Sequence, residues 1–144
     1  MAEFTGQYLH MLDPKGRLTL PSPFRDRLAG EPRAMLALRP NHCLAIYPGA
    51  EWEALLARLK TLPGTDQQAL GFKRVLLATA YPCELDKQGR IVVPPPLRAL
   101  ASITRDVTVV GAQEIVEIWD RTKWDEYLRM MLDLYDENAA KLQL

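Results

Sequence analysis

The sequence predicts an α+β protein in which two copies of one β-rich unit pack together around a pseudo-twofold axis. Residues 8–25 align with residues 81–98 at an offset of 73, and eight of the eighteen aligned positions are identical. Further along, residues 43–59 align with residues 115–131 at an offset of 72. Two stretches of similarity in the same order indicate an internal duplication.

The duplication divides the chain into short units. We expect a first repeat at 1–60, a linker and connecting helix at 61–78, a second repeat at 79–134 and a C-terminal tail at 135–144. A unit of about 60 residues buries too little surface to be comfortably stable alone. We therefore expect one interleaved domain, in which each unit covers the open sheet edges of the other.

Each unit begins with two strands joined by a tight turn. The first strands are expected at about 8–12 and 80–85, and the second strands at 17–20 and 90–93. Apolar residues alternate in the second strands, which predicts one buried face and places Arg17 and Arg90 on the other face. Pro21 and Pro94 end these strands, because proline cannot donate to a sheet ladder.

A short helix, two strands and a longer helix complete each unit. The short helices are expected to begin near Ser22 and Pro95, because proline is tolerated in a first helical turn. The two strands that follow are expected at 34–38 and 44–47 in the first unit, and at 107–110 and 115–119 in the second. The longer helices carry apolar stripes at Trp52, Leu55, Leu56 and Leu59 and at Trp124, Leu128, Met131, Leu132 and Tyr135. This spacing is typical of a packing surface. Between the units, Asp66 is expected to cap a third helix that ends at about Leu77.

Composition points to a soluble cytoplasmic protein. The chain has 144 residues, of which 48% are hydrophobic and 25% charged, close to the globular average. A membrane-spanning helix needs about 20 consecutive apolar residues, and the longest candidate, 107–112, is far shorter. The first residues lack the basic and apolar regions of a signal peptide. Cys43 and Cys83 fit neither a disulfide framework nor a zinc spacing.

The residue inventory argues against an enzyme. Neither Ser22 nor Ser102 lies in a nucleophile elbow. His42 and Cys43 are adjacent on a strand, so their side chains point to opposite faces. No glycine-rich phosphate loop is present. We therefore expect no catalytic residue, no metal, no cofactor and no small-molecule substrate.

Charge is distributed unequally although the net charge is zero. Residues 1–78 carry ten basic and seven acidic side chains, a balance of +3, whereas residues 79–144 have a balance of −3. Such asymmetry can mark a side that faces a polyanion. A solvated acidic helix near the C-terminus is the simpler explanation and the one that the charge asymmetry alone favours.

The doubled turn Leu-Asp-x-x-Gly-Arg is the sharpest feature. A hairpin connection by itself accounts for Asp13, Gly16, Asp86 and Gly89, because aspartate and glycine are favoured turn residues. No hairpin needs an arginine after the turn. A guanidinium there can bond the aspartate of its own turn, or present a fork of donors to phosphate or guanine. Basic side chains cluster nearby: Lys15, Arg25, Arg27, Lys87 and Arg98.

The motifs LDPKGRLTLPSPFR and LDKQGRIVVPPPLR, with the later EIWDRTKWDEYL, closely resemble the MraZ family. These are bacterial transcriptional regulators built from two AbrB-type swapped-hairpin units, and the resemblance runs from about Phe4 to Leu134. It implies a duplicated AbrB-like swapped-hairpin β-barrel with peripheral helices. It also implies a nucleoid-associated regulator of the division and cell-wall gene cluster, which binds double-stranded DNA at repeated short sites upstream of its own gene.

The resemblance also implies the site residues. The family's Asp-x-x-x-Arg signature maps onto Asp13 and Arg17, and again onto Asp86 and Arg90. The family's lysine in the first turn is Lys15, whereas the second turn has Gln88 at that position. Lys87, the basic residue of the second turn, is included among the expected DNA-binding residues. The family often has an arginine where this chain has Thr5. The first turn, on the more basic half, is the better candidate for contacting DNA.

Members of the family form closed rings of many subunits, so the resemblance implies a homo-oligomer. The apolar stripes and the Trp119–Trp124 segment offer part of a subunit contact. An AbrB-type protein-interaction or antitoxin-like module without enzymatic activity is the alternative function.

Overall fold

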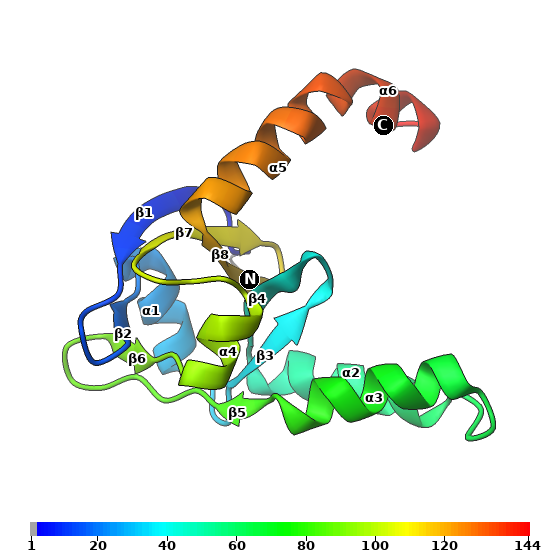
Figure 1. Cartoon of the computed structure of the whole chain (residues 1–144), viewed down its shortest axis with the longest axis horizontal. Coiled ribbons are helices and arrows are strands. Elements are labelled where there is room, and N and C mark those ends of the chain that lie inside the picture. The colour runs from blue at the N-terminus through cyan, green and yellow to red at the C-terminus, as the bar shows by residue number, and fades with distance from the viewer. Residues whose placement is uncertain (1–2) are drawn as a thin grey trace.

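A six-stranded antiparallel sheet and a separate two-stranded ribbon form the centre of the molecule (Figure 1). The computed structural model describes residues 3–144. The strands are β1 (Gln7–Met11), β2 (Arg17–Thr19), β3 (Met35–Arg39), β4 (Cys43–Tyr47), β5 (Tyr81–Pro82), β6 (Arg90–Val92), β7 (Asp106–Ala112) and β8 (Ile115–Asp120). The sheet has the order β1-β7-β8-β4-β3-β5, and β2 pairs with β6 in the ribbon.

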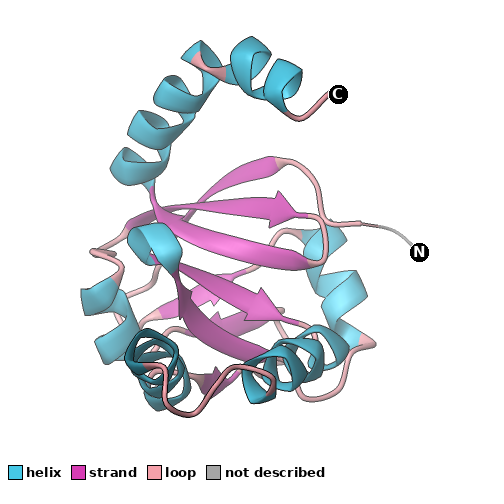
Figure 2. Ribbon diagram, turned by 90° about the vertical axis from the view of Figure 1, so that its right-hand side faces the viewer, coloured by secondary structure: helices cyan, strands magenta, loops and turns pink. Residues whose placement is uncertain are grey.

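The helices lie around these strands (Figures 1 and 2). They are α1 (Ser22–Ala29), α2 (Gly49–Lys60), α3 (Gln67–Ala78), α4 (Pro95–Leu100), α5 (Arg121–Asp133) and α6 (Tyr135–Lys141), and a 3-10 turn covers Pro40–His42. The Asp66 carboxylate caps α3 by accepting from the backbone N–H groups of Gln68 and Ala69, as predicted. No helix within residues 3–144 has both the length and the apolar character to cross a membrane.

Most strand pairs join the first half of the chain to the second. Strand β1 pairs with β7, β5 pairs with β3, β4 pairs with β8, and β2 pairs with β6. Ala45 lies opposite Glu117 and Leu18 lies opposite Ile91. Both pairs join positions that the repeat alignment makes equivalent. Neither half therefore completes a sheet from its own strands alone.

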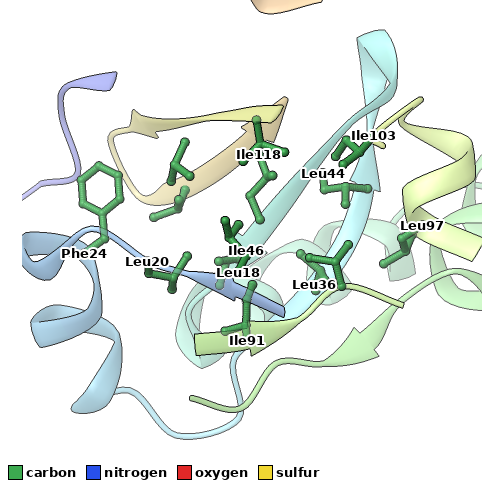
Figure 3. Packing of buried hydrophobic residues seen from close by; sticks show 14 of the residues in the cluster. Leu18, Leu20, Phe24, Leu36, Leu44, Ile46, Ile91, Leu97, Ile103 and Ile118 are labelled. Carbon is green, nitrogen blue, oxygen red and sulfur yellow. The ribbon is translucent and has the colours of Figure 1, made fainter. Parts of the chain in front are cut away.

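The main core lies between the sheet, the ribbon and the helices α1 and α4 (Figure 3). Leu18 and Ile91 of the ribbon and Ile46 and Ile118 of the sheet are almost completely buried there. Strand β4 is buried on both faces: Leu44 and Ile46 belong to this core, whereas Ala45 and Tyr47 belong to a second cluster under α2 and α3. Helix α5 covers Val110 and Trp119 in a third cluster.

The strands close no barrel among the described residues, which corrects the expected β-barrel. The ribbon joins β1 through one isolated bridge, between Leu12 and Leu18. On the other side, β5 has only two residues, although the sequence predicts a strand at 80–85. One further backbone bond, from Cys83 N–H to the Ala34 carbonyl (2.9 Å), follows Pro82, and the chain then leaves the sheet. The result is an open sheet with a ribbon across one face.

The C-terminal segment also differs from the prediction. Residues 135–141, expected to be part of a tail, form α6. Helices α5 and α6 extend away from the sheet in both views (Figures 1 and 2). Of the predicted apolar stripe, Trp124 packs against Trp119, as does the neighbouring Tyr127, whereas Leu132 of α5 and Tyr135 of α6 are exposed. Only the first two turns of this helix therefore serve as the packing surface that the periodicity predicts.

Leu18→Ala should lower the free energy of unfolding by about 2–5 kcal/mol, because it leaves a cavity at the centre of the ribbon. Leu9→Ala is a matched control, since Leu9 is 64% exposed and its loss should cost less than about 0.5 kcal/mol. Urea titrations of both variants measure the difference. Equal losses would contradict the central position of Leu18.

Candidate nucleic-acid interface

One carboxylate organises the first turn. Oδ1 of Asp13 accepts from the backbone N–H of Lys15 (2.9 Å) and of Arg17 (2.8 Å), and Oδ2 accepts from Nε of Arg17 (2.7 Å). The Asp13 carbonyl accepts from Gly16 N–H (2.9 Å), and Gly16 has a φ of +79°, which glycine tolerates better than other residues. Asp13 therefore shapes the turn and fixes the direction of the Arg17 side chain.

The second turn repeats this geometry. Oδ1 of Asp86 accepts from the backbone N–H of Gln88 and of Arg90, both at 2.9 Å, and Oδ2 accepts from Nε of Arg90 at 2.8 Å. Gly89 has a φ of +74°. The turn thus has the same conformation although Lys87 stands where the first turn has proline.

Hydrogen bonds hold both carboxylates in the charged form. The backbone N–H of Arg17 is the main cause that lowers the pKa of Asp13, and its side-chain bond and charge act in the same direction. The backbone N–H of Arg90 lowers the pKa of Asp86 in the same way. Both aspartates are therefore ionised at neutral pH, and each keeps its arginine oriented.

The two arginines lie on the outward face of the ribbon. Arg17 is opposite Val92 and Arg90 is opposite Thr19, while the intervening pair, Leu18 and Ile91, points into the core. The side chain of Arg17 is 32% exposed to solvent, and that of Arg90 is 26% exposed. This face therefore carries two cations, and the exposed residues Thr19 and Val92 lie beside them.

Each turn is also held by the opposite half of the chain. The Gly16 carbonyl accepts from Val93 N–H (2.9 Å), and the Gly89 carbonyl accepts from Leu20 N–H (3.1 Å). The guanidinium of Arg98 covers Gly16, so that a Cβ there would lie 3.1 Å from its Cζ. The Arg25 side chain covers Gly89 in the same manner.

The sequence does not predict these crossed arginine contacts, because it shows Arg25 and Arg98 only as basic residues near the turns. The one sequence feature that indicates the contacts is that the two arginines occupy the same position in the aligned repeats. The contacts bring a third cation to each turn.

Of the remaining residues considered from the sequence, Lys15 and Lys87 lie in the turns, whereas Arg27 and Thr5 lie away from them. Lys15 and Lys87 are exposed in their turns. Arg27 is not at the turns, since its guanidinium lies 4.3 Å from the centre of the Phe4 ring. Thr5 lies at the end of β1 away from the turn. Thus all six predicted site residues lie in the two turns or directly after them.

The adjacent His42 and Cys43 offer no activated nucleophile. Cys43 is 1% exposed, and burial raises the pKa of its thiol to about 12. His42 contacts the Leu100 carbonyl through Nδ1, at 3.2 Å. Among the described residues, no three side chains of His, Cys, Asp or Glu are grouped so that they could hold a metal ion.

The arrangement is suited to an anion or a base edge. Arg17 uses Nε for its own aspartate, and both terminal amino groups are free of acceptors within residues 3–144. Two parallel N–H donors match the O6 and N7 acceptors of guanine, and they also match phosphate oxygens. A two-stranded ribbon fits the major groove of B-form DNA, which is about 12 Å wide.

Comparison with known proteins places these features in a family. A family model described as "MraZ protein, putative antitoxin-like" matches twice, over residues 4–75 and 76–143. A relative named "Transcriptional regulator MraZ" from Heliobacterium modesticaldum is 44% identical over 140 residues, 96% of each chain. Relatives of the same name from Desulfitobacterium hafniense (43% over 139 residues, 96% of each chain) and Thermoanaerobacter sp. (46% over 137 residues, 95% of this chain and 94% of the relative) are similarly close.

Asp13→Asn should destabilise the protein at neutral pH, because it weakens the bonds to Arg17. The folded-state pKa of Asp13 lies below its ordinary value of 3.8. Its contribution to stability is therefore full above pH 3.8 and is lost as the pH falls through the lower folded-state value. Thermal melts between pH 7 and pH 2 should show the wild type and the variant converging in acid.

Asp26→Asn provides the control for this titration. Asp26 is exposed on α1 and makes no side-chain hydrogen bond within the described residues. Its variant should follow the wild type at every pH. A constant gap between Asp13→Asn and the wild type down to pH 2 would contradict the assigned role.

Proposed function

Because the chain belongs to the MraZ family, we propose that it is a sequence-specific DNA-binding transcriptional regulator without enzymatic activity. The relatives are named as transcriptional regulators. The observation that carries the proposal is the Arg17 fork, held by Asp13 on the outward face of a two-stranded ribbon. A side chain aimed in advance loses less conformational freedom on binding than a mobile one does.

The site residues have separate roles in this proposal. Arg17 reads a guanine edge in the major groove, and Asp13 orients it. Lys15 contacts a neighbouring phosphate, because an exposed ammonium on a flexible stem acts as a point charge. Arg90, Asp86 and Lys87 form the corresponding group of the second turn. Phosphate contacts position the ribbon, and base contacts supply the sequence preference.

The proposal extends to the biological target. We propose that the protein acts at the nucleoid in the cytoplasm, on the division and cell-wall gene cluster. Its sites are short repeats upstream of its own gene. One ribbon carries few cations and should bind DNA weakly. A protein that presents several ribbons together can bind several repeated sites at once, which raises its overall affinity.

The proposal also extends to the organisation of the two repeats. We propose two AbrB-type units, at 1–60 and 79–134, with 61–78 as the connection and 135–144 as a helical extension. Their hairpins are exchanged: β1 and β2 pair with the second unit, and β5 and β6 pair with the first. A pseudo-twofold axis through the pairs Leu18–Ile91 and Ala45–Glu117 relates the units.

A second copy of the chain is the proposed partner, in a closed ring. Helix α3 folds back beside α2 and buries Leu76, whereas Tyr135 of α6 and Leu142, which directly follows α6, are exposed at 69% and 68%. The exposed acidic residues Asp133, Asp136 and Glu137 lie close to Tyr135 in the sequence. The exposed Phe72 and Val75 of α3 lie among Lys73 and Arg74. Opposite charges therefore favour packing of α6 on α3 of the next subunit, and such head-to-tail contacts close into rings.

The Trp119–Trp124 segment contributes less to this contact than the sequence indicates. Trp119 is 4% exposed within one subunit, and its ring centre lies 5.2 Å from that of Trp124. The apolar surface available to a partner lies further along the chain, beyond Tyr127.

Arg17→Ala should weaken binding to duplex DNA from upstream of the gene by about 10-fold to 100-fold for one subunit, because a bidentate base contact is worth about 1–3 kcal/mol. Fluorescence anisotropy with this duplex and a scrambled duplex measures the loss. Arg58→Ala, on the exposed surface of α2, should bind like the wild type. Unchanged binding by Arg17→Ala with a normal melting curve would refute the proposed reading residue.

Tyr135→Ser with Leu142→Ser should reduce the oligomer towards the 16.3 kDa monomer, because it removes the exposed apolar side chains at the two ends of α6. Light scattering after gel filtration at micromolar concentration measures the mass. Leu9→Ser changes a similarly exposed residue on β1 and should leave the mass unaltered. A wild-type monomer would contradict the ring, and an unaltered double variant would contradict the α6 contact.

A further inference from the structure

The outward face of the ribbon carries a short side chain beside each of its two arginines. Leu18 and Ile91 point from these strands into the core (Figure 3), so the residues that flank them face outwards. The register sets Val92 of β6 directly opposite Arg17 of β2, and it sets Thr19 of β2 opposite Arg90 of β6. Each arginine therefore has one short, β-branched neighbour on the other strand.

Val92 is open to the surroundings on this face. It is 59% exposed, whereas Ile91, the preceding residue of the same strand, is 1% exposed. Nε of Arg17 donates to Oδ2 of Asp13 at 2.7 Å, which draws the arginine side chain back towards its own turn. Directly opposite side chains of an antiparallel pair have their Cβ atoms about 4.5–5.5 Å apart. A ligand that reaches the Arg17 fork therefore also comes within reach of Val92.

The chemistry of valine limits what it can recognise in that ligand. Its side chain has methyl groups and neither donates nor accepts a hydrogen bond, so the polar edges of the bases offer it no specific partner. The C5-methyl group of thymine is the apolar group that B-form DNA displays in the major groove. Thr19, the aligned residue of the first repeat, also carries a hydroxyl, which can bond to more than one base.

We infer that Val92 is a specificity-determining residue, which contacts the C5-methyl group of a thymine in the base pair next to the guanine that Arg17 reads. This inference rests on the proposed function. Successive base pairs lie about 3.4 Å apart along the DNA axis. The expected separation of the two Cβ atoms exceeds one such step and is less than two, and the long arginine side chain covers the difference. The two side chains thus read adjoining base pairs.

Single-atom changes in the DNA test this contact. Replacing a thymine by deoxyuridine removes the C5-methyl group and leaves the hydrogen-bonding edge unchanged. Each thymine of the duplex from upstream of the gene is replaced in turn, and fluorescence anisotropy measures the affinity of the full chain. Wild-type binding should weaken about 4-fold at the contacted thymine, as expected for one buried methyl group. In a second set, 7-deazaguanine replaces each guanine and removes N7. The guanine that Arg17 reads is the one at which the wild type weakens and Arg17→Ala does not.

Val92→Ala connects the sensitive thymine to this side chain. The variant should bind the thymine duplex about 4-fold more weakly than the wild type does, and it should bind the deoxyuridine duplex equally well. Thr19→Ala, at the aligned position, is the matched control and should keep the wild-type loss at that thymine. Thermal melts of both variants should resemble the wild type, because both residues are exposed. A purely structural role of Val92 would weaken binding to both duplexes by the same factor.

The outcomes separate the inference from the function beneath it. If Arg17→Ala binds the natural duplex like the wild type, the proposed function fails and the inference fails with it. If Arg17→Ala loses binding and no deoxyuridine duplex weakens the wild type, the inference alone is overturned. It is also overturned if Val92→Ala keeps the full loss at the sensitive thymine, or if that thymine does not adjoin the guanine located with 7-deazaguanine.

Discussion

The antiparallel pairing of β2 with β6 joins one three-residue strand from each half of the chain, and the rest of the molecule is arranged around it. Leu18 and Ile91 face each other there and are almost fully buried. Three residues cannot form a stable strand pair by themselves. The ribbon persists because its inner face closes the main core against the sheet and the helices α1 and α4. Folding of either half is thus tied to folding of the other.

The same pairing creates the candidate interface. Since alternate residues of a strand point to opposite faces, burying Leu18 and Ile91 directs Arg17 and Arg90 outwards. Each turn then receives a backbone bond and a covering arginine from the opposite half, from Arg98 at Gly16 and from Arg25 at Gly89. A hairpin cut from the chain would keep its Asp–Arg bond and lose these supports. The interface is therefore a property of the paired halves.

Much of this arrangement follows from local sequence. The repeat alignment, the alternation after each turn, and Pro21 and Pro94 predict the ribbon strands and their outward arginines, because these signals depend only on neighbouring residues. The short β5 and the open sheet were not predicted, since the extent of strand pairing depends on residues far apart in the sequence. Helix α6 was missed because residues 135–141 have no packed face to give an apolar period. The bond that Nη2 of Arg90 donates to Oε1 of Gln88 (2.8 Å) depends on side-chain geometry that spacing does not reveal.

The central claim is that this ribbon enters the major groove and that Arg17 reads guanine there. Methylation interference tests it directly, because dimethyl sulfate places a methyl group on guanine N7, the acceptor that the Arg17 fork would use. Duplex DNA from upstream of the gene is partially methylated and then separated into bound and free fractions. The account predicts that methylated guanines at a few regularly spaced positions are depleted from the bound fraction. Equal methylation of both fractions at every guanine would contradict it.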